Sequence, residues 1–484
     1  MDLLPICRSV SDSGGRLVAL WGSDERKKSN HFCLHVALVN EAGLICLNIA
    51  LDAAKPAYPN ISTIFPAAKR MQRAAYDLLG ICAEDLQDDR KWLRHGAWQG
   101  FPLRKDYDVT QNRADNLDAY PFVKVEGEGV HEIPVGPVHA GTIEPGHFRF
   151  SVVGERVLRL EERLGYVHKG IEKRFESLSL QQGAKLAGRV SGDSTVAYAW
   201  AYAMAAESIA QVTPPEHAVW LRALLLERER IANHLGDLGY LGNDVALSFG
   251  FAQFWILKEQ VLRNNAALFG HRYLMDLIVP GGVAANLAEP DKLRDECAML
   301  EREVRILRGI YEEHAGVQDR FIGAGRVEPR LAAQLGLCGL AGRASGQAWD
   351  ARVQFACAPY DKLEVQMATH RNGDVAARVM VRFEELFESL RLQREILGRL
   401  TKGETQPLQK LPGNGFGIGM VEGWRGEVLV ATHTDAEGNL ARVHPHDPSW
   451  QNWPVLEHAI LGNIVPDFPL INKSFNLSYS GQDL

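Results

Sequence analysis

The strongest constraint on this 484-residue chain is a long block of helical periodicity that ends near residue 400. Within it, apolar residues recur every three or four positions. One run consists of Leu293, Cys297, Leu300, Val304, Leu307 and Tyr311, and another of Val379, Phe383, Leu386 and Leu390. Such spacing places apolar side chains on one face of a helix. The block therefore predicts several helices packed around a common core.

Short apolar runs flank this block. Between residues 16 and 51 they alternate with Gly, Asn and Ser signals, which predicts an antiparallel sheet, and a helix is expected from Ala67 to Leu79. Two more strands are expected around 147–160, and others near 418–443. The expected fold class is α+β: an antiparallel-sheet α+β domain followed by a mainly helical domain with small β elements.

Residues 108–130 are polar and lack the apolar periodicity of a helix or a strand. A chain of this length can form two or three domains, each with its own core. We expect one domain at 1–115, a linker at 116–130 and a second domain at 131–484.

Composition excludes several functional classes. Hydrophobic residues make up 46% of the chain, charged residues 23%, and the formal net charge is -7, so a general nucleic-acid binder is not indicated. No run of about 18 apolar residues and no charged-then-apolar signal pattern occurs. The expected location is the cytoplasm.

Seven cysteines are scattered through the chain without any CxxC pair. This spacing argues against a disulfide framework, a zinc site or an iron–sulfur cluster held by this chain. Gly281 and Gly282 do not follow a strand-to-helix fingerprint, so NAD would have to bind elsewhere in a complex. The polar residues of 229–234 fit packing and hydrogen bonding between helices better than a zinc site.

Four segments of the first domain carry a family resemblance. They read YPNI (58–61), FPAA (65–68), YDLLGI (76–81) and PLRKDY (102–107). With them the domain resembles the 30-kDa subunit family of respiratory complex I. The resemblance implies that residues 1 to about 115 form a separate folding unit.

From about residue 130 the chain resembles the 49-kDa subunit of complex I. It is still more similar to the large subunits of membrane-bound group 4 [NiFe] hydrogenases, of the formate hydrogenlyase and energy-converting-hydrogenase-related types. The segments that carry this are GPVH (136–139), EPGHFR (144–149), GYVHKGIEK (165–173), ERIANH (229–234), PGGV (280–283), GRASG (342–346), NGDV (372–375) and VEGWRGE (421–427). The resemblance implies a hydrogenase-large-subunit-like second domain.

The positions that hold nickel in those hydrogenases are changed here. The four that match metal-binding cysteines are Ser191, Ser194, Asn476 and Tyr479, and the position of a trailing histidine is Tyr198. A soft nickel–iron centre needs anionic sulfur donors, which hydroxyl and amide groups replace poorly. We therefore expect no nickel.

By the same resemblance, Glu144, Tyr198, Tyr479 and Arg425 are the catalytic candidates. Glu144 matches a proton-relaying glutamate, although a turn carboxylate that is merely capped or ion-paired would look the same. The two tyrosines could hydrogen-bond a quinone carbonyl or could fill the space that the metal vacated. Arg425 requires an acidic or carbonyl partner, for which Glu144 and Asp483 are the candidates, and a buried salt bridge could equally hold the pocket shut.

Further pocket-lining candidates are His139, His147, Ser191, Asp193, Ser194, Asn476 and Asp483. The histidines also suit structural roles in turns. Ser191 or Ser194 could simply cap the helix that runs from Ala197 to Glu207. The complex I tyrosine that holds a quinone headgroup is matched by Leu180, which lacks the hydroxyl.

The resemblance implies an oxidoreductase subunit that is related to NADH-quinone oxidoreductase. It would receive electrons from a small iron–sulfur partner subunit, reduce a quinone, associate with membrane ion-pumping subunits and hold no cofactor of its own. It would lie peripherally on the inner face of the cytoplasmic membrane. The alternative is a non-catalytic scaffold between the iron–sulfur and membrane subunits.

Overall fold

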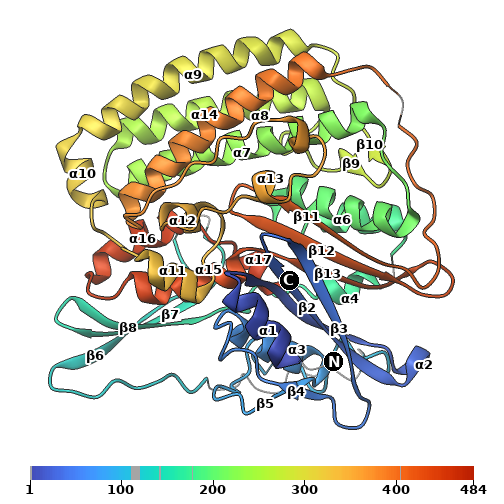
Figure 1. Ribbon diagram of the computed structural model, residues 1–484. Helices are drawn as coiled ribbons and strands as arrows, with labels where there is room; N and C mark the ends of the chain where they lie inside the picture. The colour runs from blue at the N-terminus through green and yellow to red at the C-terminus, as the bar shows by residue number, and fades with distance from the viewer. Residues whose placement is uncertain are drawn as a thin grey trace.

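The computed structural model describes residues 3–96, 98–108, 110, 120–140, 143–176, 178–403 and 405–484. Long helices form one side of the molecule, a three-stranded sheet lies in the middle, and the N-terminal elements cover the opposite side (Figure 1). The expected α+β fold class is confirmed, and the strands form several small sheets.

The N-terminal part contains α1 (Leu3–Asp12), β1 (Arg16–Asp24), α2 (Arg26–Ser29), β2 (His31–Asn40), β3 (Gly43–Asp52), β4 (Ala57–Pro59), α3 (Ala68–Leu79) and β5 (Cys82–Glu84). Strands β1, β2 and β3 form the expected antiparallel sheet. Helix α3 packs on β1 and ends where Gly80 adopts φ +73°, a conformation that glycine tolerates readily. The prediction of this helix is confirmed.

A second antiparallel sheet follows: β6 (Val130–Val135), β7 (His147–Val153) and β8 (Arg156–Arg163). The two strands expected around 147–160 are therefore confirmed. Most of the polar stretch that precedes 120, residues 111–119, lies outside the described residues, and 120–129 contains neither helix nor strand.

The helical block begins with α4 (Ile171–Phe175), α5 (Leu180–Ala187), α6 (Thr195–Ala210), α7 (Glu216–Asp244) and α8 (Ser248–Phe269). After the short strands β9 (Ile278–Val279) and β10 (Gly282–Val283) come α9 (Pro290–Glu313), α10 (Ala315–Phe321), α11 (Pro329–Leu335), α12 (Gly339–Ala344), α13 (Ala351–Gln354) and α14 (Val375–Arg399). Every residue of the two predicted apolar stripes is buried, on α9 and α14 respectively.

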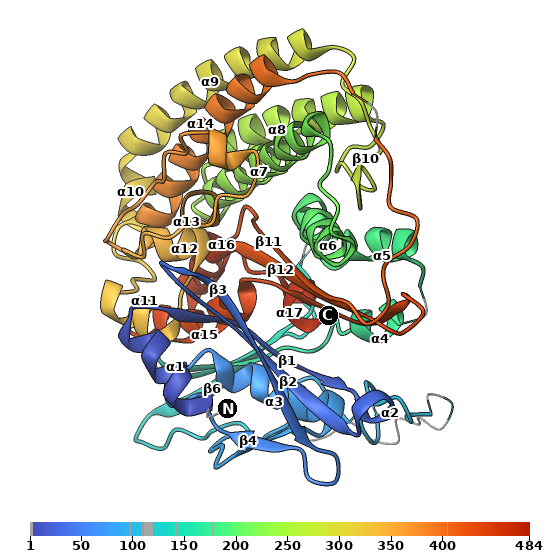
Figure 2. The ribbon, with the colours of Figure 1, turned by 45° about the vertical axis from the view of Figure 1, so that its right-hand side comes forward.

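The central sheet consists of β11 (Phe416–Glu422), β12 (Glu427–Thr434) and β13 (Leu440–His446), all antiparallel. Helix α6 lies directly against β11 and β12 (Figure 2). This contact depends on glycine, because a Cβ at Gly419 would come within 2.0 Å of the Ala201 carbonyl oxygen. The strands expected near 418–443 are confirmed.

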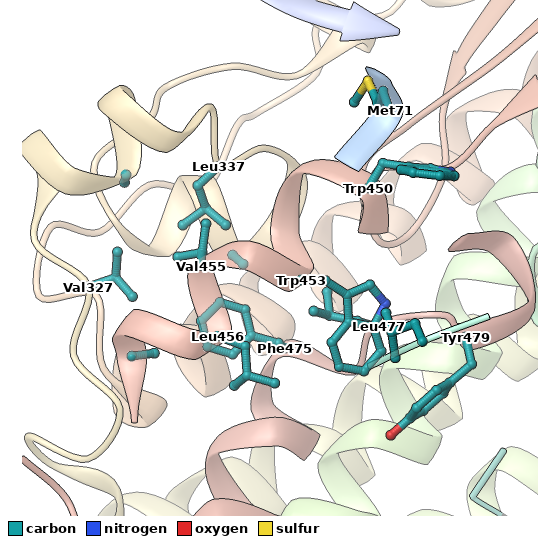
Figure 3. Packing of buried hydrophobic residues seen from close by; sticks show 14 of the residues in the cluster. Met71, Val327, Leu337, Trp450, Trp453, Val455, Leu456, Phe475, Leu477 and Tyr479 are labelled. Atoms are coloured by element: carbon teal, nitrogen blue, oxygen red, sulfur yellow. The ribbon is translucent and has the colours of Figure 1, made fainter. Parts of the chain in front are cut away.

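The chain ends with α15 (Ser449–Ala459), α16 (Phe468–Phe475) and α17 (Tyr479–Asp483). Their apolar side chains belong to a cluster that also includes Met71 of α3 and Leu337 (Figure 3). The core thus runs across the 30-kDa-like and 49-kDa-like parts. Arg70 of α3 also joins the parts, with hydrogen bonds of 2.9 Å to Glu162 and 2.8 Å to Glu457.

No helix in the described ranges is both long enough and apolar enough to cross a membrane.

Candidate functional site

A cavity of about 590 Å³ lies where α16 and α17 meet the turn at Gly192 and the C-terminal end of α7. We call it the C-terminal cavity. Six of the predicted site residues line it: Glu144, Ser191, Asp193, Arg425, Asn476 and Tyr479. The cavity lining combines residues from segments 144–149, 189–198, 421–427 and the C-terminal stretch, which are far apart in the sequence. The fold thus brings these segments together, as the resemblance implied.

Arg425 is held by Asp193, not by Glu144 or Asp483 as expected. Its Nη1 donates to Asp193 Oδ1 at 2.8 Å and its Nη2 to Oδ2 at 2.5 Å, while Nε donates to the Asn476 carbonyl. Burial opposes the charge on Asp193, but Arg425 outweighs it and lowers the pKa of that carboxyl to about 2. The expected partners were wrong because the Trp424 indole fixes the Asp193 backbone next to Arg425, at 2.9 Å from its carbonyl.

Behind Arg425 lies a network of buried ion pairs. Arg230 donates to Glu385 at 2.6 Å and to the Gly423 carbonyl at 2.7 Å. Arg343 donates to Glu385 and Glu422, each at 2.7 Å. Most of these residues come from the segments ERIANH, GRASG and VEGWRGE. Several family segments therefore contribute to the same network of buried ion pairs. The network holds the 422–425 loop, and with it Arg425, in place.

Glu144 is half-buried at the wall of the C-terminal cavity. One of its carboxylate oxygens accepts hydrogen bonds from the backbone N–H and the hydroxyl of Ser480, both at 3.1 Å. No salt bridge to Glu144 is found among the described residues. The pKa of Lys169 is lowered by burial, an effect that the charges of Glu144 and Asp483 offset in part. Within the described chain, Glu144 is therefore a carboxylate at the cavity wall that forms no salt bridge.

Tyr479 lines the same cavity and is buried. Its ring packs edge-on against Trp453, with 4.8 Å between centroids, and its hydroxyl points out of the apolar cluster (Figure 3). Within the part of the chain that the structure describes, this hydroxyl forms no hydrogen bond of acceptable geometry. Burial raises the pKa of Tyr479, and the neighbouring Asn472 side chain offsets only part of that effect. The phenol is therefore a neutral donor at the cavity wall whose hydroxyl is buried and lacks a well-aligned partner among the described residues.

Tyr198 is placed differently. It is fully buried, does not line the C-terminal cavity, and donates to Asp447 Oδ2 at 2.7 Å. Burial and the Asp447 charge raise its pKa well above the usual value. Of the two phenols treated alike in the sequence, only Tyr479 reaches the cavity.

Three positions that match nickel ligands are satisfied within the protein. Ser191 donates to Asp193 at 2.7 Å and shares a 2.9 Å hydrogen bond with Ser478. Ser194 accepts a long contact of 3.4 Å from Arg425. Asn476 donates to Asp237 at 2.5 Å.

The expected serine cap of α6 was wrong. Neither serine bonds the first amides of the helix; the Glu229 carboxylate does so, at 2.7 Å to the Val196 N–H and 3.2 Å to the Ala197 N–H. A long acidic side chain from α7 reaches these amides, whereas Ser194 contacts Arg425. Burial raises the pKa of Glu229 to about 8 in spite of the two N–H donors.

The two histidines lie beside the cavity and bind turn carbonyls, His139 to Gly146 at 2.7 Å and His147 to Gly136 at 3.1 Å. Asp483 is buried and accepts from the N–H groups of Gly165 and Val167. Burial raises the pKa of Asp483 to about 7. Leu180 is buried in the core against Tyr202, whose hydroxyl donates to its carbonyl.

Five polar residues that α7 and α16 add to the lining were not among the predicted site residues: Tyr240, Asn243, Asp244, Asn472 and Lys473. The first three recur at i, i+3 and i+4 near the end of α7, and the other two lie on α16 just before Asn476. That spacing marks one face of each helix, which is the signal that could have identified them. Lys473 Nζ lies 4.8 Å from the Tyr240 ring centroid.

The donors at the four matching positions do not suit a nickel–iron centre. Hydroxyl and amide groups occupy all four, and those of Ser191, Ser194 and Asn476 already contact other protein groups. Neutral oxygen is also a poor ligand for a soft metal. Among the residues that the structure describes, no group of three or more His, Cys, Asp and Glu side chains could hold a metal ion.

Comparison with known protein families identifies both parts of the chain. Residues 1–113 match the family model of the respiratory-chain NADH dehydrogenase 30-kDa subunit. Residues 244–414 match that of the 49-kDa subunit.

Relatives align with most or nearly all of the chain. Formate hydrogenlyase subunit 5 of Escherichia coli K12 is 32% identical, over 97% of this chain and 85% of its own length. The C/D subunit of NADH-quinone oxidoreductase from Phocaeicola vulgatus is 30% identical, over 78% and 77%. A chain in the structure of the membrane-bound sulfane sulfur reductase, an archaeal respiratory membrane complex, shares the fold with a TM-score of 0.70 and 24% identity, over 74% of this chain and 99% of that one.

Proposed function

Because this chain belongs to the family of fused complex I 30-kDa/49-kDa-type subunits, which includes formate hydrogenlyase subunit 5, we propose that it carries the electron-acceptor site of its complex. The chain is an oxidoreductase-family subunit of a membrane-associated complex that is related to complex I and to group 4 hydrogenases. The proposed acceptor is a quinone that enters the C-terminal cavity.

The observation that carries the proposal is the joint presence of Glu144 and Tyr479 in the lining of a cavity of about 590 Å³, with the Tyr479 hydroxyl lacking a well-aligned partner among the described residues. A scaffold that had merely lost its metal would be expected to fill that space. Reduction of a quinone to a quinol takes two electrons and two protons, one for each carbonyl oxygen. Tyr479 can donate a hydrogen bond to one carbonyl, and Glu144 can deliver a proton to a carbonyl oxygen and be reprotonated from solvent.

Arg425 supports a neutral ligand over an anionic one. Its guanidinium is already bound by the Asp193 carboxylate and by the Asn476 carbonyl, so little of its charge is left for a substrate. We assign Arg425 the task of holding the cavity wall. Tyr198, bound to Asp447, holds α6 against the β13–α15 junction and does not contact the ligand.

The partners follow from the same proposal. Electrons would come from an iron–sulfur cluster in a small partner subunit, and ion-pumping subunits would lie in the membrane. This chain would then be peripheral on the cytoplasmic face and would hold neither NAD nor nickel. Metal analysis of the purified complex should find no nickel that depends on this chain.

Replacing Glu144 by Gln in the assembled complex tests the proposal. The change keeps the shape and an oxygen for the hydrogen bonds from Ser480 but removes the exchangeable proton, so quinone reduction should fall by roughly 10²-fold or more. Glu155→Gln is the matched control, because Glu155 is an exposed carboxylate on the β7–β8 turn. Equal turnover of an assembled Glu144→Gln complex and its parent would favour the scaffold instead.

A further inference from the structure

A second, smaller cavity also borders the Gly192–Asp193 turn. It has a volume of about 240 Å³ and is formed by α7, α8 and the loop that follows α8. We call it the Lys258 cavity. Its apolar lining includes Ala232, Leu262, Leu274 and Met275, and Tyr273, which is 48% exposed, stands at its edge. A dry cavity of 150 Å³ holds a benzene molecule, so this one has room for a small organic ligand.

Lys258 lines this cavity, and its side chain is mostly buried. Its ammonium lies over the backbone of α7, because a Cβ at Gly236 would come within 2.6 Å of Nζ. The Trp255 ring is also near, with 4.9 Å from Nζ to the centroid. Glycine at 236 thus allows the lysine to lie inward instead of extending into water, as lysines usually do.

The carboxylates that favour the charge of this ammonium are already paired with arginines. Asp237 and Asp193 are the acids that favour its charge, and both already hold arginines: Asp237 binds Arg382 at 2.9 Å, and Asp193 binds Arg425. Among the described residues Lys258 forms no salt bridge. Burial lowers its pKa, as expected for an ammonium that lacks a direct partner.

The other charged groups of the lining are compensated. Arg272 binds Glu259 at 2.6 Å. The Glu229 carboxyl faces the amides at the start of α6, and its raised pKa, about 8, leaves it largely protonated at neutral pH. Lys258 is therefore the one lining charge, within the described chain, that lacks a close counter-ion.

We propose that the Lys258 cavity binds a small organic monoanion, with its carboxylate on Lys258 and a short apolar end against Leu262, Leu274 and Met275. The cavity shares only Gly192 and Asp193 with the C-terminal cavity. Binding there is independent of the quinone chemistry. It places the ligand against the turn that holds Arg425.

The test uses fluorine NMR of 3,3,3-trifluoropropionate added to the purified full complex. The parent should broaden the ligand signal, and neutral trifluoropropanol should bind at least about ten times more weakly, since a charge-assisted hydrogen bond is lost. Lys258→Met keeps most of the stem length and should weaken binding by a similar factor. Met275→Trp, which fills the cavity, should abolish it.

Two controls make the outcome specific. Lys402→Met removes an exposed lysine and should leave binding unchanged. Glu144→Gln should also leave binding unchanged, even if quinone reduction is lost, so this proposal and the proposed function can fail separately. Absence of broadening in the parent, or equal binding by Lys258→Met or by the neutral alcohol, would overturn the proposal.

Discussion

Two buried tyrosines of this chain lie at positions that match metal-site residues of related hydrogenases. Their surroundings differ. Tyr198 donates a hydrogen bond to Asp447 at 2.7 Å inside the core, whereas Tyr479 lines the C-terminal cavity and its buried hydroxyl has no well-aligned partner among the described residues. A residue type at a family position therefore does not define a role by itself. The role depends on which neighbour the phenol meets.

This difference predicts different effects of the same substitution. Tyr198→Phe removes the hydroxyl that donates to Oδ2 of the buried Asp447 and should lower the free energy of unfolding by about 1–3 kcal/mol. Tyr479→Phe removes no well-aligned internal hydrogen bond, so it should change stability by less than about 0.5 kcal/mol and instead raise the KM for quinone. Chemical denaturation and steady-state kinetics would check both; a large stability loss in Tyr479→Phe would show that its hydroxyl has an internal partner after all.

At the scale of elements, the contact between α6 and the central sheet leaves no room for side chains at two strand positions. Gly417 and Gly419 of β11 face the α6 backbone, where a Cβ would come within 2.2 Å of the Ala205 oxygen and 2.0 Å of the Ala201 oxygen. Backbone atoms cannot move aside as a flexible side chain can. The two elements approach so closely only because alternate positions of the strand have no side chain.

Gly419→Ala should therefore destabilise the protein by at least about 1–3 kcal/mol, the usual cost of overpacking. Gly309→Ala is the matched control, since Gly309 lies inside α9 with nothing within 4 Å of the added methyl group. That change should stabilise by up to about 1 kcal/mol, because glycine is a poor helix former. Thermal unfolding of the two variants, with shifts of opposite sign, is the measurement.

The strands of the two halves meet through stacked aromatic rings. Trp21 of β1 stacks on His35 of β2, at 5.1 Å between centroids, and on His444 of β13, at 4.8 Å, and His446 follows next to Trp450. Burial lowers the pKa of His35 to about 4 and that of His446 to about 3. Both rings are neutral in the folded protein at physiological pH.

These lowered pKa values predict acid sensitivity. In the unfolded chain the two histidines titrate near ~6.5, so below that pH the unfolded state binds more protons than the folded state. Their contribution to stability is complete above ~7 and is lost as the pH falls from about 6.5 toward 4. A His35→Gln/His446→Gln double variant should show a shallower decline of Tm between about pH 7 and about pH 4.5, and the exposed His131→Gln should not. An unchanged slope in the double variant would contradict this origin.

At the scale of the whole molecule, the two family-matched parts share their interior. Val18, Ala19 and Trp21 of the first part form one buried cluster with Leu429 and Ala431 of β12. The Arg442 guanidinium donates to the Gly22 carbonyl at 3.0 Å and to Glu172 at 2.6 Å. The first part therefore covers apolar and charged surface of the second.

Deleting residues 1–115 should expose that surface. We expect the remaining chain, 116–484, to bind a hydrophobic dye more strongly than the full chain and to aggregate at lower temperature. Supplying residues 1–115 as a separate chain should reverse both effects if the interface reforms. A truncated protein with the dye binding and Tm of the full chain would contradict this role of the interface.

The sequence alone determined the family and many of the elements. Helical stripes on α9 and α14, the alternating strands of β1 to β3 and eight ordered family segments were sufficient, because these signals depend on spacing along the chain. It also identified part of the C-terminal cavity lining, since the relevant segments carry the family positions. The polar residues that α7 adds to that lining lie outside those segments.

Only the tertiary structure decided which side chains meet. Asp193 as the partner of Arg425, Glu229 as the cap of α6, and the separation of Tyr198 from Tyr479 all depend on contacts between residues tens to hundreds of positions apart. The same holds for Lys258, because its lack of a close counter-ion within the described chain is visible only once Asp193 and Asp237 are seen to hold arginines. Periodicity specifies the face of an element, but the pairing of charges is set by how the faces pack.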